Sequence, residues 1–179
     1  MLLESASTEH IDSRYHIIVA DPVATLTTHT SANQVQGKPE QTLTAIQRND
    51  ITTEYNDEPF ELLQNTLDNV IGKLDNSVSE LPFIAGALGY FGYDLGRSIE
   101  VFESHKESEK IDSSLNKHSI AQDDLDFPDM LVGLYEWAII IDTHTQQAWQ
   151  TQYSIDAEQA WLARQQWLIA QGVGVEASE

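Results

Sequence analysis

The residues most suggestive of chemistry lie in one glycine-rich stretch, residues 82–100. It places Gly86, Gly89, Gly92 and Gly96 between large aromatic and aliphatic side chains. Repeated glycine lets a ligand or another backbone come close, so one hypothesis is a ligand-binding or catalytic wall. The alternative is a crowded core strand. The residue types alone favour this alternative, because aromatic side chains between glycines bury large areas. A nucleotide-binding loop is not indicated, since the order G-x-G-x-x-G is missing.

No complete catalytic motif is present in the sequence. No glycine-rich loop precedes a lysine and a hydroxyl residue, no Gly-x-Ser-x-Gly turn occurs, and His-Glu-x-x-His is absent. The chain has no cysteine, which excludes disulfides, zinc–thiolate sites and thiol catalysis. Carboxylates are numerous, but they are the expected background in a chain with a net charge of -20. We therefore predict no catalytic residue and no metal site in these 179 residues.

The acidic charge also limits the partners. Nucleic acids and anionic membranes repel such a surface, so neither is expected to bind. No apolar run approaches the length of a membrane span, and the opening Met1-Leu2-Leu3 is followed at once by Glu4, unlike a signal peptide. These features predict a cytoplasmic protein. The length is sufficient for one domain with its own core.

The predicted elements are mostly strands. β-branched and aromatic residues between turn signals predict strands at 2–5, 15–28, 41–48, 83–92, 130–141 and 148–153. Apolar residues at helical spacing predict helices at 57–71 and 156–171, each followed by a glycine. Together they predict an α+β fold in which antiparallel sheet is flanked by helices.

Three segments carry further expectations. Pro22 marks a break, a bulge or an edge position in the segment 15–28, because proline cannot donate to a sheet, so this segment is either two strands or one bent strand. The strand 130–141 is apolar on both alternating faces, which predicts that it is covered on both sides. The polar stretch 103–126 is predicted to be a mobile acidic loop.

Three blocks resemble the component I enzymes that use chorismate. Residues 81–97 read Leu-Pro-Phe-x-x-Gly-Ala-Leu-Gly-x-Phe-Gly-Tyr-Asp-Leu-Gly-Arg, which closely resembles the amino-terminal half of aminodeoxychorismate synthase component I. Anthranilate synthase component I has a looser version of this run. The second block is 128–142, and the third comprises 2–5, 12–15 and 20–22. The blocks cover the chain from its first residues to about Asp142.

The resemblance implies that residues 1–179 are a single N-terminal domain of a longer enzyme, truncated at both ends. The parent would convert chorismate and glutamine-derived ammonia to 4-amino-4-deoxychorismate, toward 4-aminobenzoate and folate. The chorismate and Mg²⁺ site would lie in the C-terminal half, so this part alone would be inactive and would hold no cofactor. The implied partners are that C-terminal half, a glutamine amidotransferase subunit and L-tryptophan.

The implied fold is half of an orthogonal β-sandwich. An isolated half would leave an apolar sheet face uncovered, so we expect this part alone to self-associate or to expose a large apolar patch.

The resemblance also implies a tryptophan pocket lined by Ser5, Asp12, Ser13, Arg14 and Tyr15. The two serine hydroxyls and the Arg14 cation would serve the polar ends of the amino acid, while Tyr15 would pack on the indole. Asp12 departs from the aromatic residue that well-known members carry there. In the alternative without a ligand, the serines satisfy strand ends and Arg14 pairs with a surface acid.

Two other functions remain open on the sequence. One is the N-terminal domain of anthranilate synthase component I, where the pocket would receive tryptophan as feedback inhibitor. The other is a self-standing amino-acid-binding or interaction module.

Overall fold

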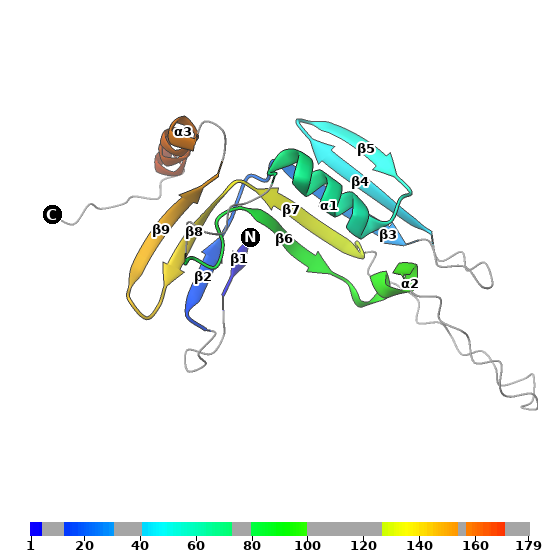
Figure 1. Ribbon diagram of the computed structural model, residues 1–179, viewed down its shortest axis with the longest axis horizontal. Coiled ribbons are helices and arrows are strands. Elements are labelled where there is room, and N and C mark those ends of the chain that lie inside the picture. The colour runs from blue at the N-terminus through cyan, green and yellow to red at the C-terminus, as the bar shows by residue number, and fades with distance from the viewer. Residues whose placement is uncertain (5–12, 31–40, 73–79, 100–126, 154–156, 171–179) are drawn as a thin grey trace, which may run out of the picture. The chain divides into compact units, whose positions relative to one another are not determined.

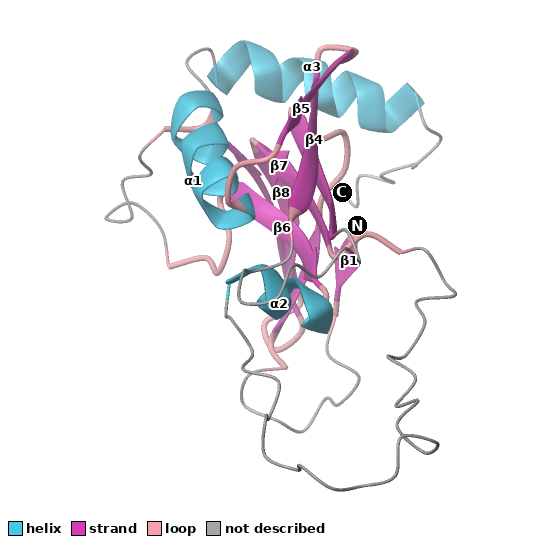
Figure 2. Ribbon diagram, turned by 90° about the vertical axis from the view of Figure 1, so that its right-hand side faces the viewer, coloured by secondary structure: helices cyan, strands magenta, loops and turns pink. Residues whose placement is uncertain are grey.

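The computed structural model describes residues 1–4, 13–30, 41–72, 80–99, 127–153 and 157–170 (Figure 1). Strands predominate over helices in these ranges, and α1 (Pro59–Val70) and α3 (Ala157–Ala170) are the longer helices (Figure 2). No helix within the described part of the chain is both long and apolar enough to cross a membrane. The loop predicted at 103–126 lies outside the described residues.

The chain divides into two compact units. The first comprises residues 1–24, 66–88 and 133–179, and the second comprises 25–65 and 89–132. The single-domain boundary expected from the sequence stays a prediction.

A four-stranded sheet in the order β1-β2-β8-β9 belongs to the first unit. Its strands are β1 (Leu2–Leu3), β2 (Tyr15–Ile18), β8 (Trp137–Asp142) and β9 (Gln147–Gln152). All three pairings are antiparallel, and the register places Tyr15 opposite Asp142. The first residue of β2 therefore lies beside the last residue of β8.

The core of the first unit forms around this sheet. Five apolar residues are buried together: Val19, Leu88, Tyr135, Ala138 and Ile140. Partly buried side chains pack against them: Tyr15, Ile17, Leu81, Phe83 and Trp149. Tyr15 thus joins the core to the polar residues that precede β2.

A five-stranded sheet has the order β5-β4-β3-β7-β6. Its strands are β3 (Ala24–Thr30), β4 (Thr42–Arg48), β5 (Ile51–Tyr55), β6 (Gly86–Phe91) and β7 (Met130–Tyr135). Alternate residues of β3 are buried, as a strand with one core face requires. The hydroxyls of Thr28 and Thr44, both fully buried, satisfy each other at 2.8 Å.

The segment 15–28 is two strands, one of the two alternatives that the sequence left open, whereas the single strand predicted at 130–141 was too long. The segment 15–28 forms β2 and β3, and the segment 130–141 forms β7 and β8, with the members of each pair in different sheets. The first break falls at Asp21 and Pro22, where Asp21 has a left-handed φ of 55°. The second falls at Glu136, the single charged residue in that apolar segment. The dense burial predicted for 130–141 is confirmed, since β7 and β8 are mostly buried.

Strand β5 was missed because all five of its residues are exposed and show no apolar alternation. It pairs antiparallel with β4 across a two-residue turn. Asn49 and Asp50 have φ of 49° and 61°, so both occupy the left-handed region that a type I′ hairpin turn demands. The Asn-Asp dipeptide was the available sequence signal.

Helix α1 begins two residues later than predicted. The Glu58 carboxylate accepts the backbone N–H groups of Phe60 at 3.1 Å and Glu61 at 2.7 Å, which satisfies donors of the first turn. The helix ends where Gly72, at φ 80°, donates its N–H to the Leu67 carbonyl, so the predicted glycine stop is confirmed. The Phe60 ring stacks on Phe91 of β6 at 5.4 Å.

The glycine-rich stretch forms β6, a 3-10 helix at Tyr93–Leu95 and the short helix α2 (Gly96–Ile99). A Cβ on Gly89 would lie 2.1 Å from the Leu131 carbonyl oxygen, and one on Gly92 would lie 3.1 Å from the Asp129 carbonyl oxygen. These two glycines let β6 and the residues that follow it pack directly against the backbone of residues 129–132. This supports the crowded-strand interpretation of the stretch.

Helix α3 is held by a cation between two indoles of the first unit. The Arg164 guanidinium lies 4.6 Å from the Trp137 ring centroid and 5.3 Å from that of Trp167. It also donates to the Asp21 carboxylate at 2.7 Å. The Arg164 side chain is only 18% exposed, so the ring contacts are largely shielded from water.

Replacing Arg164→Ala is expected to lower the free energy of unfolding by about 1–2 kcal/mol, chiefly through the lost cation–π contacts. Chemical denaturation measures this change. Gln166→Ala, at an exposed position of the same helix, is the matched control and should stay within about 0.5 kcal/mol of wild type. Equal stability of the two variants would show that the contacts of Arg164 with the indoles do not stabilise the fold.

Candidate ligand-binding site

The described part of the predicted pocket is a short segment at the start of β2. Ser13 and Arg14 form the turn before the strand, and Tyr15 is its first residue. Antiparallel pairing with β8 brings the β8–β9 turn, residues 143–146, beside this segment. Ser5 and Asp12 lie outside the described residues.

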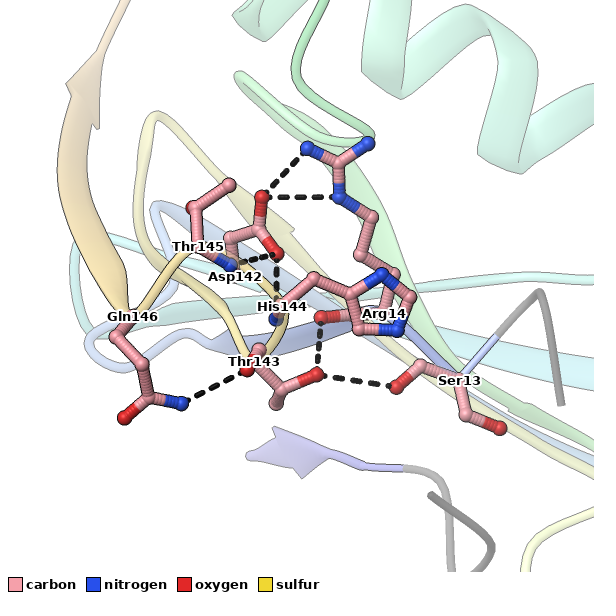
Figure 3. A network of polar contacts seen from close by, with 7 residues as sticks. All are labelled: Ser13, Arg14, Asp142, Thr143, His144, Thr145 and Gln146. Atoms are coloured by element: carbon pink, nitrogen blue, oxygen red, sulfur yellow. Dashed lines mark hydrogen bonds and ion pairs between the residues drawn. The ribbon is translucent and has the colours of Figure 1, made fainter. Parts of the chain in front are cut away.

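Arg14 and Asp142 form an ion pair at the centre of this region (Figure 3). The Arg14 Nε and Nη2 groups both donate to Asp142 Oδ2, at 2.9 Å and 2.6 Å. The Asp142 side chain is 0% exposed, whereas that of Arg14 is 42% exposed. A buried carboxylate is costly without a partner, so Asp142 depends on the guanidinium that covers it.

The second carboxylate oxygen of Asp142 organises the β8–β9 turn. Oδ1 accepts the backbone N–H groups of His144 at 2.9 Å and Thr145 at 3.2 Å. Thr143 bonds back to the Arg14 carbonyl oxygen through both its hydroxyl and its backbone N–H, each at 2.9 Å. Figure 3 shows these bonds joining the turn to the Ser13–Arg14 backbone. One carboxylate therefore fixes two separate chain segments.

The pair shifts both ionisation equilibria. The hydrogen bonds from Arg14 hold the pKa of the Asp142 carboxyl well below its usual range, and the N–H groups of His144 and Thr145 act in the same direction. The hydrogen bond to Asp142 raises the pKa of Arg14. Both groups are therefore charged at every physiological pH.

The depressed pKa of Asp142 predicts a specific pH dependence of stability. A carboxyl whose folded pKa lies below its unfolded value stabilises the fold above the unfolded value, and this contribution is lost as the pH falls below about 4. Asp142→Asn keeps the acceptor for the turn but removes the charge. At pH 7 we expect its midpoint of thermal unfolding to lie roughly 5 °C or more below that of wild type.

The difference between the two proteins should shrink as the pH is lowered to 3, because the carboxyl then takes up a proton in the unfolded wild-type chain while it stays ionised in the folded one, which lowers the free energy of unfolding of the wild type. Comparing the two at each pH cancels the titration of the other acidic residues, which is large in a chain with a net charge of -20. A difference that stays constant from pH 7 to 3 would contradict the charge-based role of Asp142.

The other predicted pocket residues are less available than the sequence implied. Ser13 is buried, and Tyr15 is half-buried against the core of the first unit. The Arg14 guanidinium lies 4.9 Å from the Tyr15 ring centroid and covers one ring face. Arg14 pairs with an acid, as the alternative without a ligand expected, but the acid is buried rather than on the surface. The ligand-lining roles of these residues stay predictions.

Asp142 and Thr143 were not identified from the sequence as part of this region. Their signal was the change from an apolar strand to Asp-Thr-His-Thr, in which Asp142 is the only charge. An aspartate at a strand end more often caps its own turn. Only the strand register reveals that this one also reaches Arg14.

The described residues offer no metal centre. Among them, no three His, Asp or Glu side chains gather closely enough to hold a metal ion.

Comparison with solved structures finds a similar fold in a component I enzyme. Anthranilate synthase component I from Streptococcus pneumoniae matches with a TM-score of 0.51 and 18% sequence identity, over 96% of this chain and 32% of that one. The chain thus has the fold of part of a component I enzyme, with antiparallel sheets and flanking helices as predicted. No protein-family model matches the chain.

Comparison with curated proteins identifies the relatives within this class. Aminodeoxychorismate synthase component 1 of Escherichia coli is 38% identical over 168 residues, 93% of this chain and 31% of that protein. Its counterparts in Klebsiella aerogenes and Salmonella typhimurium are 34% and 36% identical, over 99% and 92% of this chain and 32% and 31% of their own lengths. The chain is therefore related to aminodeoxychorismate synthase component 1, as predicted, and spans about a third of the length of these relatives.

Proposed function

We propose that this chain is the N-terminal, non-catalytic domain of an aminodeoxychorismate synthase component I. The observation that carries the proposal is the match of nearly the whole chain to only a third of each relative. The domain would serve the parent by building its fold and by holding a ligand pocket.

The proposed parent reaction is the conversion of chorismate and ammonia to 4-amino-4-deoxychorismate, on the path to 4-aminobenzoate and folate. Mg²⁺ and chorismate would bind in the remaining part of the parent chain, and a glutamine amidotransferase subunit would supply ammonia. All of these events are proposed to occur in the cytoplasm. The contribution of the described residues is structural, and no step of the reaction is assigned to them.

The remaining part of the parent chain is the proposed partner for exposed apolar side chains of the second unit. Ile51, Phe91 and Tyr93 are 68%, 50% and 98% exposed. Large apolar side chains exposed to this extent are suited to burial under another polypeptide. Expressed alone, residues 1–179 should therefore self-associate as their concentration rises, which sedimentation velocity measures.

L-tryptophan is the proposed ligand of the segment Ser13–Tyr15, together with Ser5 and Asp12. The support is the ordered network that fixes the backbone of this segment beside a core aromatic residue. Isothermal titration of the full-length parent with L-tryptophan tests the proposal. Saturable binding at one site per chain is expected, and the absence of heat up to millimolar ligand would reject it.

A second candidate is a domain of anthranilate synthase component I, which the match in fold to the Streptococcus pneumoniae protein favours. The product of the full-length parent separates the two. Incubation with chorismate, Mg²⁺ and ammonia should give 4-amino-4-deoxychorismate, detected by chromatography. Anthranilate as the product would select the second candidate.

A further inference from the structure

Strand β5 has one open edge. It is the last strand of the five-stranded sheet, and among the described strands it pairs with β4 alone (Figure 1). All five of its residues are exposed. Such an edge presents backbone N–H and C=O groups with which a further strand can pair.

The hairpin register determines which backbone groups face the open edge. Arg48 and Ile51 flank the two-residue turn and lie opposite each other, so they exchange backbone hydrogen bonds. Successive residues of a strand direct these groups to opposite sides, so Ile51 and every second residue after it bond toward β4. The backbone groups of Thr52 and Glu54 therefore point to the open edge.

A second copy of β5 fits this edge in one antiparallel register. With Thr53 on the two-fold axis, Thr52 of each copy lies opposite Glu54 of the other, and no charge of the strand faces a like charge. Shifting one copy by two residues places either Glu54 opposite Glu54 or Glu54 opposite Asp50. Like charges directly opposite each other destabilise a strand pair, so repulsion disfavours both shifted registers.

The same register brings exposed apolar side chains together. Ile51 and Tyr55 are 68% and 37% exposed, and they lie on the same face of β5. Ile51 of each copy would lie opposite Tyr55 of the other, in a pair without backbone hydrogen bonds, where side chains approach most closely. An aromatic ring opposite a β-branched side chain is a favourable cross-strand pair.

We infer that β5 is a self-pairing edge through which two copies of this chain join their five-stranded sheets into one continuous antiparallel sheet. One short strand buries less than the roughly 1,200 Å² typical of stable interfaces, so the dimer is weak, with a dissociation constant on the order of 10–100 µM. This inference goes beyond the proposed function and narrows it in one respect. Ile51 contacts the second copy, and Phe91 and Tyr93 remain for the rest of the parent chain.

Sedimentation velocity of the full-length parent, from about 5 to about 500 µM, measures the dimer over a range that brackets the expected constant. Thr52→Lys and Thr53→Lys are matched variants, because each adds one positive charge at an exposed position of β5. Thr52→Lys places an ammonium opposite Glu54 of the other copy and should tighten the dimer about threefold to tenfold. Thr53→Lys places two ammonium groups opposite each other on the axis and should weaken it at least about tenfold.

The opposite effects of the two variants identify the register. Both variants reduce the net charge of -20, so association without a fixed register would strengthen in both. Equal effects of the two variants, in either direction or none, would overturn the inference. A wild-type parent that stays monomeric over the whole range would overturn it as well.

Hydrogen exchange locates the contact independently. The amides of Thr52 and Glu54 should exchange freely at the lowest concentration and become protected as the dimer forms, whereas β4 protects the Thr53 amide throughout. Protection of Thr52 and Glu54 in a monomeric parent would show that the rest of the parent chain occupies the edge, and would overturn the inference. Either failure leaves the proposed reaction in place, because chorismate turnover is measured separately.

Discussion

Gly89→Ala is expected to lower the free energy of unfolding by at least about 3 kcal/mol, enough to leave a marginal domain largely unfolded. The added Cβ would lie 2.1 Å from the Leu131 carbonyl oxygen and 2.6 Å from the Val132 Cα. Both contacts are with backbone of the neighbouring strand β7, so no side-chain rotation relieves them. Either β6 must move away from β7 or the pairing between them must break.

Gly96→Ala is the matched control within the same glycine-rich stretch. A Cβ there meets nothing within 4 Å, and the residue has a helical φ of -56°. This change should leave stability unchanged or raise it by up to about 1 kcal/mol, because alanine favours helix. Urea denaturation of both variants measures the contrast. Equal stability of the two variants would show that β6 does not approach β7 as described.

Trp137→Ala is expected to lower the free energy of unfolding by about 3–5 kcal/mol, the usual range when a large buried aromatic side chain is truncated to alanine. The Trp137 side chain is 2% exposed, and its ring contacts both Arg164 and Trp167 of α3. Its loss should therefore loosen α3 as well as the sheet. Hydrogen exchange of the α3 amides reports this second effect separately from global unfolding.

Trp137→Phe gives the informative comparison. The indole Nε1 is buried and has no hydrogen-bond partner among the described residues. Phenylalanine removes this unsatisfied donor and keeps an aromatic face for Arg164. Trp137→Phe should therefore lower the free energy of unfolding by no more than about 1.5 kcal/mol. If both substitutions lower the free energy of unfolding equally, packing of the aromatic ring is not the main way in which Trp137 stabilises the fold.

The sequence pattern was sufficient to predict those elements whose structure depends on residues close together in the chain. The apolar stripe and Gly72 predicted α1 to within two residues, and the strand at 41–48 appears as Thr42–Arg48. The burial of Met130 to Ile140 also followed from residue type. In each case the signal and its structural cause lie within a few residues of each other.

The chain departs from these predictions where partners distant in sequence decide. A strand that moves between sheets at Glu136 looks continuous, because both of its parts are apolar. Strand β5 was missed because pairing with β4, not burial, defines it. Which strands pair depends on the topology of the sheet, and the spacing of apolar residues along one strand does not specify its partner.

The same limit applied to the candidate site. Arg14 was found through family resemblance, but its partner Asp142 lies 128 residues away in sequence. From sequence, the acid opposite Arg14 could be any of 29 carboxylates. The antiparallel register of β2 and β8 selects one of them and changes Arg14 from a free cation to a paired one.

Chorismate turnover by matched proteins tests the central proposal most directly. Residues 1–179 and the full-length parent are each incubated with chorismate, Mg²⁺ and ammonia, and the products are separated by chromatography. The full-length parent should form 4-amino-4-deoxychorismate, whereas residues 1–179 should leave chorismate unchanged. Product formation by residues 1–179 alone would contradict a non-catalytic role for this domain.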